Sequence, residues 1–269
     1  MRESDPIIII DRFARYQNEC AELFIEIAKC LQPRNPKLVA ICGDQFNFMA
    51  ARSNALIELV KVNALWDAQI LVRPIIESCV KVCFLCFSPE EKRSALCLEY
   101  EEALGLINTL KLHDKALKTL GANEGIRHPT LEALLLSEDK LKELREKIPK
   151  EVRKDIESRW GFTRMVVALD QSFKEHFQIS PFSSLLHTYG LSSHLIHADE
   201  TGLGTIRSRG RLEEPRLSEI TASHQIALLD AMAGASMMAA ISLAWAAQGR
   251  IEDALQLIQT YGRVHEGSY

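Results

Sequence analysis

The residues best suited to chemistry lie in one short segment, from His187 to Glu200. If this segment is helical, Tyr189, Ser193 and His197 are spaced by four residues and share one face. The residues that flank this stripe are mostly apolar. A polar stripe on such a helix indicates a buried polar site, although an ordinary hydrogen-bonded network in the core fits the pattern at least as well.

The same segment also contains residue types that bind metals. His194 and His197 are three residues apart, and Asp199 could supply a third ligand. This spacing differs from the helical His-Glu-x-x-His pattern of metalloproteases, and no cluster of Cys or His elsewhere in the sequence completes it. We therefore expect no metal and no other cofactor, with a site formed by these three residues as the alternative.

Two opposite charges, Arg73 and Glu77, interrupt an apolar run that extends from Ile70 to Val82. Charged groups in such a run must pair with each other or face a polar pocket. Arginine offers a fork of N–H donors that suits a phosphate or a carboxylate. The pattern therefore has two interpretations: a structural ion pair that bridges helices, or an anion-binding arginine that Glu77 orients.

Three arginines, Arg207, Arg209 and Arg211, follow the histidine-bearing segment. They lie between Ala198 and Pro215, which the glycines in this stretch predict to be the longest irregular segment. Arginines in such a loop could hold a nucleic-acid phosphate backbone. A solvated loop is the favoured interpretation, and the lack of aromatic neighbours gives no indication of base stacking.

The elements that must position these residues are predicted to be helices. Apolar residues recur at helical spacing, and start signals such as Asp5-Pro6, Ser88-Pro89 and Ser180-Pro181 agree with this period. Pro74 lies inside the third helical run and is expected to kink it. The order of long helices and short loops predicts an all-α, up-and-down bundle of about seven to nine helices around a single core.

Composition narrows the class of protein further. Apolar residues make up 47% of the 269 residues, which is enough for a sizeable core. The 32 basic and 36 acidic residues give a net charge of −4, which argues against a protein whose whole surface binds nucleic acid. The seven cysteines are scattered through apolar segments, and the first residues do not resemble a signal peptide. We therefore expect reduced thiols and a cytoplasmic location.

The apolar stretch from Ile226 to Ala247 requires a separate interpretation. Much of its apolarity comes from alanine, and Asp230 lies inside it, so a buried helix is expected in place of a membrane span. Ala231, Ala235 and Ala239 recur every four residues, which allows close helix packing and suggests a homodimer.

No linker divides the chain. We expect one all-helical domain over residues 1–269, with a motif-bearing core over 39–200 and C-terminal helices over 217–261.

The motifs together resemble a family of uncharacterised bacterial all-helical proteins. The resemblance rests on an R-x-x-x-E helix, an acidic-aromatic turn, a W-G element and a Y-x-x-x-S-x-x-x-H helix, which are Arg73 to Glu77, Cys97 to Glu101, Trp160-Gly161 and Tyr189 to His197. It covers about Asn54 to Asp199. Pro74 is a departure, because that position is usually a small or aliphatic helix former.

That family is distantly similar to the HEPN helical domains of prokaryotic conflict systems, many of which are metal-independent ribonucleases. Their signature is an Arg followed by a His four to six residues later, and no Arg of this chain has a His at that spacing. Arg73 and His197 would therefore have to meet across two helices. The resemblance implies an effector of a bacterial defence or toxin module that acts on RNA or a nucleotide, with a partner protein of that module.

In this ribonuclease hypothesis His197 is the general acid or base, because histidine ordinarily titrates near neutrality. Arg73 stabilises the anionic transition state, and Glu77 orients Arg73. Tyr189 and Ser193 position the phosphate or the imidazole. The alternative is a non-catalytic helical binding module in which the same residues form a structural or anion-sensing cluster.

Overall fold

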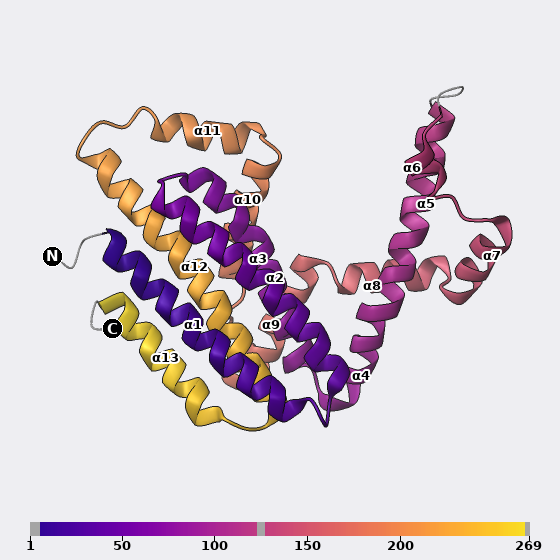
Figure 1. Ribbon diagram of the computed structural model, residues 1–269, viewed down its shortest axis with the longest axis horizontal. Helices are drawn as coiled ribbons and strands as arrows, with labels where there is room; N and C mark the ends of the chain where they lie inside the picture. The colour runs from indigo at the N-terminus through magenta and orange to yellow at the C-terminus, as the bar shows by residue number, and fades with distance from the viewer. Residues whose placement is uncertain (1–5, 123–126, 267–269) are drawn as a thin grey trace.

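The computed structural model describes residues 6–122 and 127–266, and every regular element in this part of the chain is a helix (Figure 1). The helices are α1 (Pro6–Leu31), α2 (Pro36–Lys61), α3 (Leu65–Phe87), α4 (Glu90–Leu98), the π-helical turn η1 (Glu99–Ala103), α5 (Leu104–Ala122), α6 (Pro129–Glu132), α7 (Glu138–Lys147), α8 (Lys150–Arg159), α9 (Phe162–Phe177), α10 (Ser184–Ile196), α11 (Glu200–Arg209), α12 (Arg216–Ala247) and α13 (Ile251–Glu266).

The all-α prediction is confirmed, whereas the predicted number of helices is too low. With α4, η1 and α5 counted as one continuous segment, the described residues form 12 helices, 11 of which have seven or more residues. Two features account for the excess. The polar region before Arg159 breaks into three short helices, and the segment predicted to be irregular contains α11. The predicted cap at Asp5 lies outside the described residues.

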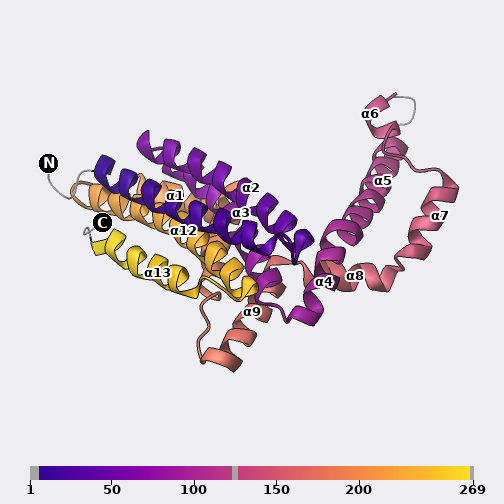
Figure 2. The same ribbon diagram turned by 60° about the horizontal axis from the view of Figure 1, so that its bottom comes forward.

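The main body is a bundle in which α1, α2, α3, α12 and α13 lie side by side (Figures 1 and 2). The central position belongs to α3 and α12, which pack against each other and against α2. The contiguous core draws buried residues from all five helices. Cys79, Cys83 and Cys86 on α3 are buried free thiols, as their spacing on one helical face predicts.

Among the described helices, α12 alone is long and apolar enough to cross a membrane, and its most apolar 18-residue window is 56% buried inside the protein. This burial agrees with the core-helix interpretation. Ala235 and Ala239 are buried within the chain, so most of the small-residue face is not available to a second copy. Asp230, the acidic residue inside the apolar stretch of this helix, accepts a hydrogen bond from the Tyr261 hydroxyl and lies 2.8 Å from His265 Nε2, both on α13.

An arm projects from the bundle, formed by α5, α6, α7 and α8, which lie within residues 104–122 and 129–159 (Figures 1 and 2). Its buried residues include Leu110, Ala116 and Leu144, which do not belong to the contiguous core of the bundle. At its base, the Glu99 carboxylate of η1 accepts a hydrogen bond from Trp160 Nε1 at 3.1 Å and pairs with Arg159. These contacts tie the two ends of the arm together.

Helix α11 corrects the prediction of an irregular segment from Ala198 to Pro215. Asp199 caps α11, because its Oδ1 accepts a hydrogen bond from the Gly202 N–H at 3.1 Å. A Cβ atom on Gly202 would lie 2.6 Å from the backbone oxygen of His194, so α11 crosses the end of α10 at a distance that only glycine permits. This glycine therefore serves helix packing and does not mark a loop.

Candidate functional site

The site forms where α10 packs against α3, and it joins three of the predicted residues. Arg73 on α3 donates from Nη1 to Ser193 Oγ at 3.0 Å and from Nη2 to the Tyr189 hydroxyl at 2.8 Å, both on α10. Its guanidinium carbon also lies 4.5 Å from the centroid of the Tyr189 ring. We call Arg73, Tyr189 and Ser193 the guanidinium–hydroxyl cluster.

The tyrosine of this cluster is held by a second aromatic ring. Phe162, the first residue of α9, stacks on Tyr189 with ring centroids 3.9 Å apart and an interplanar angle of 12°. Phe162 is itself buried, so the Tyr189 ring lies between a fixed ring and the guanidinium. The hydroxyl group is therefore positioned before any ligand arrives.

The hydrogen-bond directions in the cluster leave donors unused. Arginine can only donate, so both hydroxyl oxygens accept from Arg73 and their own protons point elsewhere. In the described part of the chain, no group accepts a hydrogen bond from either hydroxyl, and no carboxylate forms an ion pair with Arg73. The cluster thus combines a half-buried positive charge with two O–H donors.

Glu77 lies one turn along α3 from Arg73 and pairs with Lys81 at 3.5 Å. In the described residues, no ion pair or hydrogen bond joins Arg73 to Glu77. The two hydroxyls of α10 orient Arg73, and Lys81 pairs with Glu77.

His197 is the C-cap residue of α10 and lies one turn beyond Ser193. Its backbone N–H donates to the Ser193 carbonyl oxygen at 3.1 Å, while its side chain is exposed. No hydrogen bond or ion pair of the described residues involves the His197 imidazole. The predicted four-residue spacing thus brings Tyr189 and Ser193 to Arg73 but leaves His197 at the edge of the site.

The alternative metal site receives no support. His194 Nδ1 lies 2.6 Å from Asp199 Oδ2, and this hydrogen bond, together with the one from the Gly202 N–H, lowers the pKa of Asp199. Within residues 6–122 and 127–266, no group of three or more His, Cys, Asp or Glu side chains is arranged to hold a metal ion. The pair instead ties the end of α10 to the cap of α11.

The three arginines predicted to bind nucleic acid point in different directions. Arg207 pairs with Glu200 on the same helix, and Arg211 is exposed beyond the end of α11. Arg209 turns inward, where its guanidinium carbon lies 5.2 Å from the Trp66 ring centroid and its Nη2 donates to Thr221 Oγ1 at 2.9 Å. Arg207 and Arg209 are two residues apart on α11 and therefore face different sides of this helix.

Sequence reasoning missed a chain of hydrogen bonds beside the cluster, which runs from a partly buried arginine to a buried serine. Arg209 donates to His224 Nδ1, so the proton of the neutral imidazole is on Nε2, which donates to Gln69 Oε1 at 3.1 Å. Gln69 Nε2 in turn donates to Ser192 Oγ at 2.9 Å. Burial, and secondarily the charge of Arg209, lower the pKa of His224 to about 4. We call these four residues the histidine chain.

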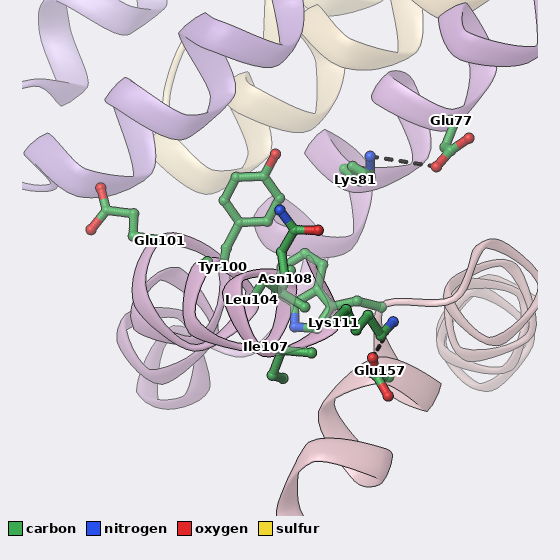
Figure 3. Close-up of a pocket in the computed structure, with 11 residues that line it drawn as sticks. Glu77, Lys81, Tyr100, Glu101, Leu104, Ile107, Asn108, Lys111 and Glu157 are labelled. Carbon is green, nitrogen blue, oxygen red and sulfur yellow. Dashed lines mark ion pairs between the residues drawn. The ribbon is translucent and has the colours of Figure 1, made fainter. Parts of the chain in front are cut away.

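A cleft of about 460 Å³ opens one helical turn beyond the cluster, between α3, the η1–α5 segment and α8 (Figure 3). Its lining includes side chains of both charges, an aromatic pair and an apolar floor: Glu77, Lys81, Tyr100, Glu101, Leu104, Ile107, Asn108, Lys111, Glu157 and Trp160. Three of the motifs quoted above, R-x-x-x-E, the acidic-aromatic turn and W-G, each contribute to it.

One signal in the sequence could have located the histidine chain, the guanidinium–hydroxyl cluster and the cleft. Gln69, Arg73, Glu77 and Lys81 recur every four residues and form a polar stripe along α3. The first of them joins the histidine chain, the second the guanidinium–hydroxyl cluster and the last two the cleft.

Residues 41–210 match the model of a family of unknown function, DUF5677. The match covers more than half of the chain and encloses the region that carries the motifs, and it brings no HEPN assignment. No curated protein and no solved structure matches the chain.

Proposed function

Because the chain belongs to the DUF5677 family, whose function is unknown, its activity must be inferred from its own site, and we propose that it is a non-catalytic helical module that binds an oxyanion. The guanidinium–hydroxyl cluster is the binding site. The observation that carries the proposal is that Arg73 has no carboxylate partner among the described residues, while the Tyr189 and Ser193 hydroxyls still have protons to donate.

The chemistry of these donors selects the ligand class. A guanidinium and two hydroxyls suit the oxygens of a phosphate or a carboxylate, which accept several hydrogen bonds at once. Because Arg73 is half-buried, the attraction between its charge and an anion is less screened than at an open surface. A bound oxyanion would also neutralise a charge that the chain itself leaves without an acidic partner.

The test is isothermal titration calorimetry of the full chain with inorganic phosphate and, separately, with acetate. We expect Tyr189→Phe to keep the fold and to weaken binding about tenfold, the effect of one hydrogen bond to a charged group. Arg73→Met should abolish binding, and Arg211→Met, which removes an exposed arginine, should leave it unchanged. If Tyr189→Phe and Arg73→Met both bind as tightly as the wild type, the proposal is wrong.

The ribonuclease hypothesis is the second candidate, and one observation favours it. His197 lies on the same face of α10 as Tyr189 and Ser193, and its imidazole is exposed one turn beyond Ser193. A phosphodiester held by Arg73 would then have a general acid or base nearby. Induced expression in a bacterial host, with growth and RNA integrity read together, tests this. RNA fragmentation that persists in an equally abundant His197→Ala protein would contradict the mechanism.

A further inference from the structure

We propose that the cleft of Figure 3 is a second binding site, which takes a zwitterionic ligand of the amino-acid or short-peptide class. The proposal is independent of oxyanion binding at the guanidinium–hydroxyl cluster, because it rests on different side chains.

Two ion pairs border the cleft. Glu77 and Lys81 pair at 3.5 Å on α3, and Lys111 on α5 pairs with Glu157 on α8 (Figure 3). Each pair therefore presents one carboxylate and one ammonium group to the same space. In a ligand that carries both a carboxylate and an ammonium group, the carboxylate can lie beside a lysine of one pair and the ammonium group beside a glutamate of the other.

The charge pattern disfavours ligands of a single sign. A polyanion would meet the carboxylates of Glu77 and Glu157, and each lysine of the cleft is already neutralised by a glutamate. The third carboxylate, that of Glu101, pairs with Lys37 at 3.4 Å and adds no free charge. A simple cation would meet both lysines. Like charges brought together in a partly enclosed site are repelled, so the cleft selects against both kinds of ligand. A zwitterion avoids the repulsion.

The walls and floor of the cleft suit an apolar side chain. Leu104 and Ile107 supply apolar surface, and the rings of Tyr100 and Trp160 lie 5.1 Å apart between centroids. Both rings are fixed: the Tyr100 hydroxyl accepts from Gln45 Nε2 at 2.6 Å, and Trp160 Nε1 donates to Glu99. The two rings contact each other, so an aliphatic or aromatic side chain of a ligand would pack against a surface that is already ordered.

The size and the backbone of the cleft agree with this ligand class. A volume of about 460 Å³ lies in the range of small-molecule sites and accommodates an amino acid with a large side chain or a dipeptide. Tyr100 and Glu101 belong to the π-helical turn η1, a rare backbone form that is frequent at functional sites.

Calorimetric titration of the full chain with chemically matched probes tests the proposal. The probes are L-leucine, L-phenylalanine and leucyl-leucine, compared with N-acetyl-L-leucinamide, 4-methylpentanoate and isopentylamine, which lack one or both charges. We expect at least one zwitterion to bind, and each analogue of leucine to bind at least about tenfold more weakly. Glu77→Gln and Lys111→Met should each weaken zwitterion binding about tenfold.

The control variant is Lys140→Met, which breaks a comparable ion pair with Glu143 on α7, outside the cleft. It should bind the zwitterion as the wild type does, and circular dichroism should report the same helix content for all three variants. The proposal is overturned if no zwitterion binds at millimolar concentration, if N-acetyl-L-leucinamide binds as tightly as leucine, or if neither cleft variant changes the affinity. Phosphate affinity should be unchanged by Lys111→Met, which separates this site from the cluster.

Discussion

His224 makes the stability of the protein depend on pH. Its pKa is lowered from 6.5 to about 4, so between these values the unfolded chain binds a proton that the native protein does not. Stability is therefore lost as the pH falls from about 6.5 to about 4. The full shift would correspond to about 3 kcal/mol, which partial exposure of the ring reduces to about 1–2 kcal/mol. We expect His224→Asn to lose this part of the pH dependence.

Urea denaturation at a series of pH values across that interval measures the effect. His187→Asn is the matched control, because it removes an exposed histidine of α10 and should keep the wild-type slope. A His224→Asn protein whose stability falls with acid as steeply as that of the wild type would contradict the assignment of His224 as a partly buried neutral imidazole.

Spacing alone predicts part of the candidate site. The four-residue repeat groups Tyr189 with Ser193, and the apolar surroundings of Arg73 predict a polar partner for it. The contact between Gln69 and His224 joins positions 155 residues apart, and nothing in the local sequence distinguishes His224 from an exposed histidine. This contact forms because α12 packs on α3, and that packing depends on the whole core and not on the local sequence.

The crossing of α10 and α11 predicts opposite effects for two glycines of one helix. Gly202→Ala would place a Cβ 2.6 Å from the His194 backbone oxygen, so α11 must move. We expect a loss of about 1–3 kcal/mol in the free energy of unfolding. Around Gly204 the nearest atoms are side-chain ends 3.9 Å away, so Gly204→Ala should stabilise by about 0.5–1 kcal/mol.

Urea midpoints of the two variants and the wild type measure this difference. Equal stability of Gly202→Ala and Gly204→Ala would show that α11 does not pack on α10 as closely as described.

The same crossing explains why the sequence is misleading at α11. Glycines between Ala198 and Pro215 predict a loop, because glycine ordinarily weakens a helix. Here Gly202 is required by the backbone of a neighbouring helix, which sequence spacing cannot reveal. The turn η1 is similar, because its sequence, Glu-Tyr-Glu-Glu-Ala, is that of an ordinary helix and does not indicate the π-helical form.

Most of the buried apolar residues of the molecule lie in the bundle, and few lie in the arm. Helical period and the apolarity of α12 predict the bundle, since a helix that is apolar on all sides must be surrounded by others. They do not predict the arm, in which α7 and α8 are short and highly charged. Tertiary contacts, and not helix length, decide which part of such a chain is stable.

The arm should consequently open before the bundle does. Near its base, Ile107, Ile148 and Ile156 join the contiguous core, whereas the buried Leu110, Ala116 and Leu144 lie outside it. The amide protons around these last three residues should therefore exchange by local opening at a lower free energy than those of α3 and α12. Leu144→Ala removes a buried side chain of α7. It should lower the free energy of local opening by about 2–5 kcal/mol and therefore accelerate amide exchange within the arm alone. Leu228→Ala, at an equally buried site on α12, should accelerate exchange across the bundle. Native-state hydrogen exchange read by mass spectrometry measures both, and acceleration of the α12 amides by Leu144→Ala would mean that arm and bundle unfold as one unit.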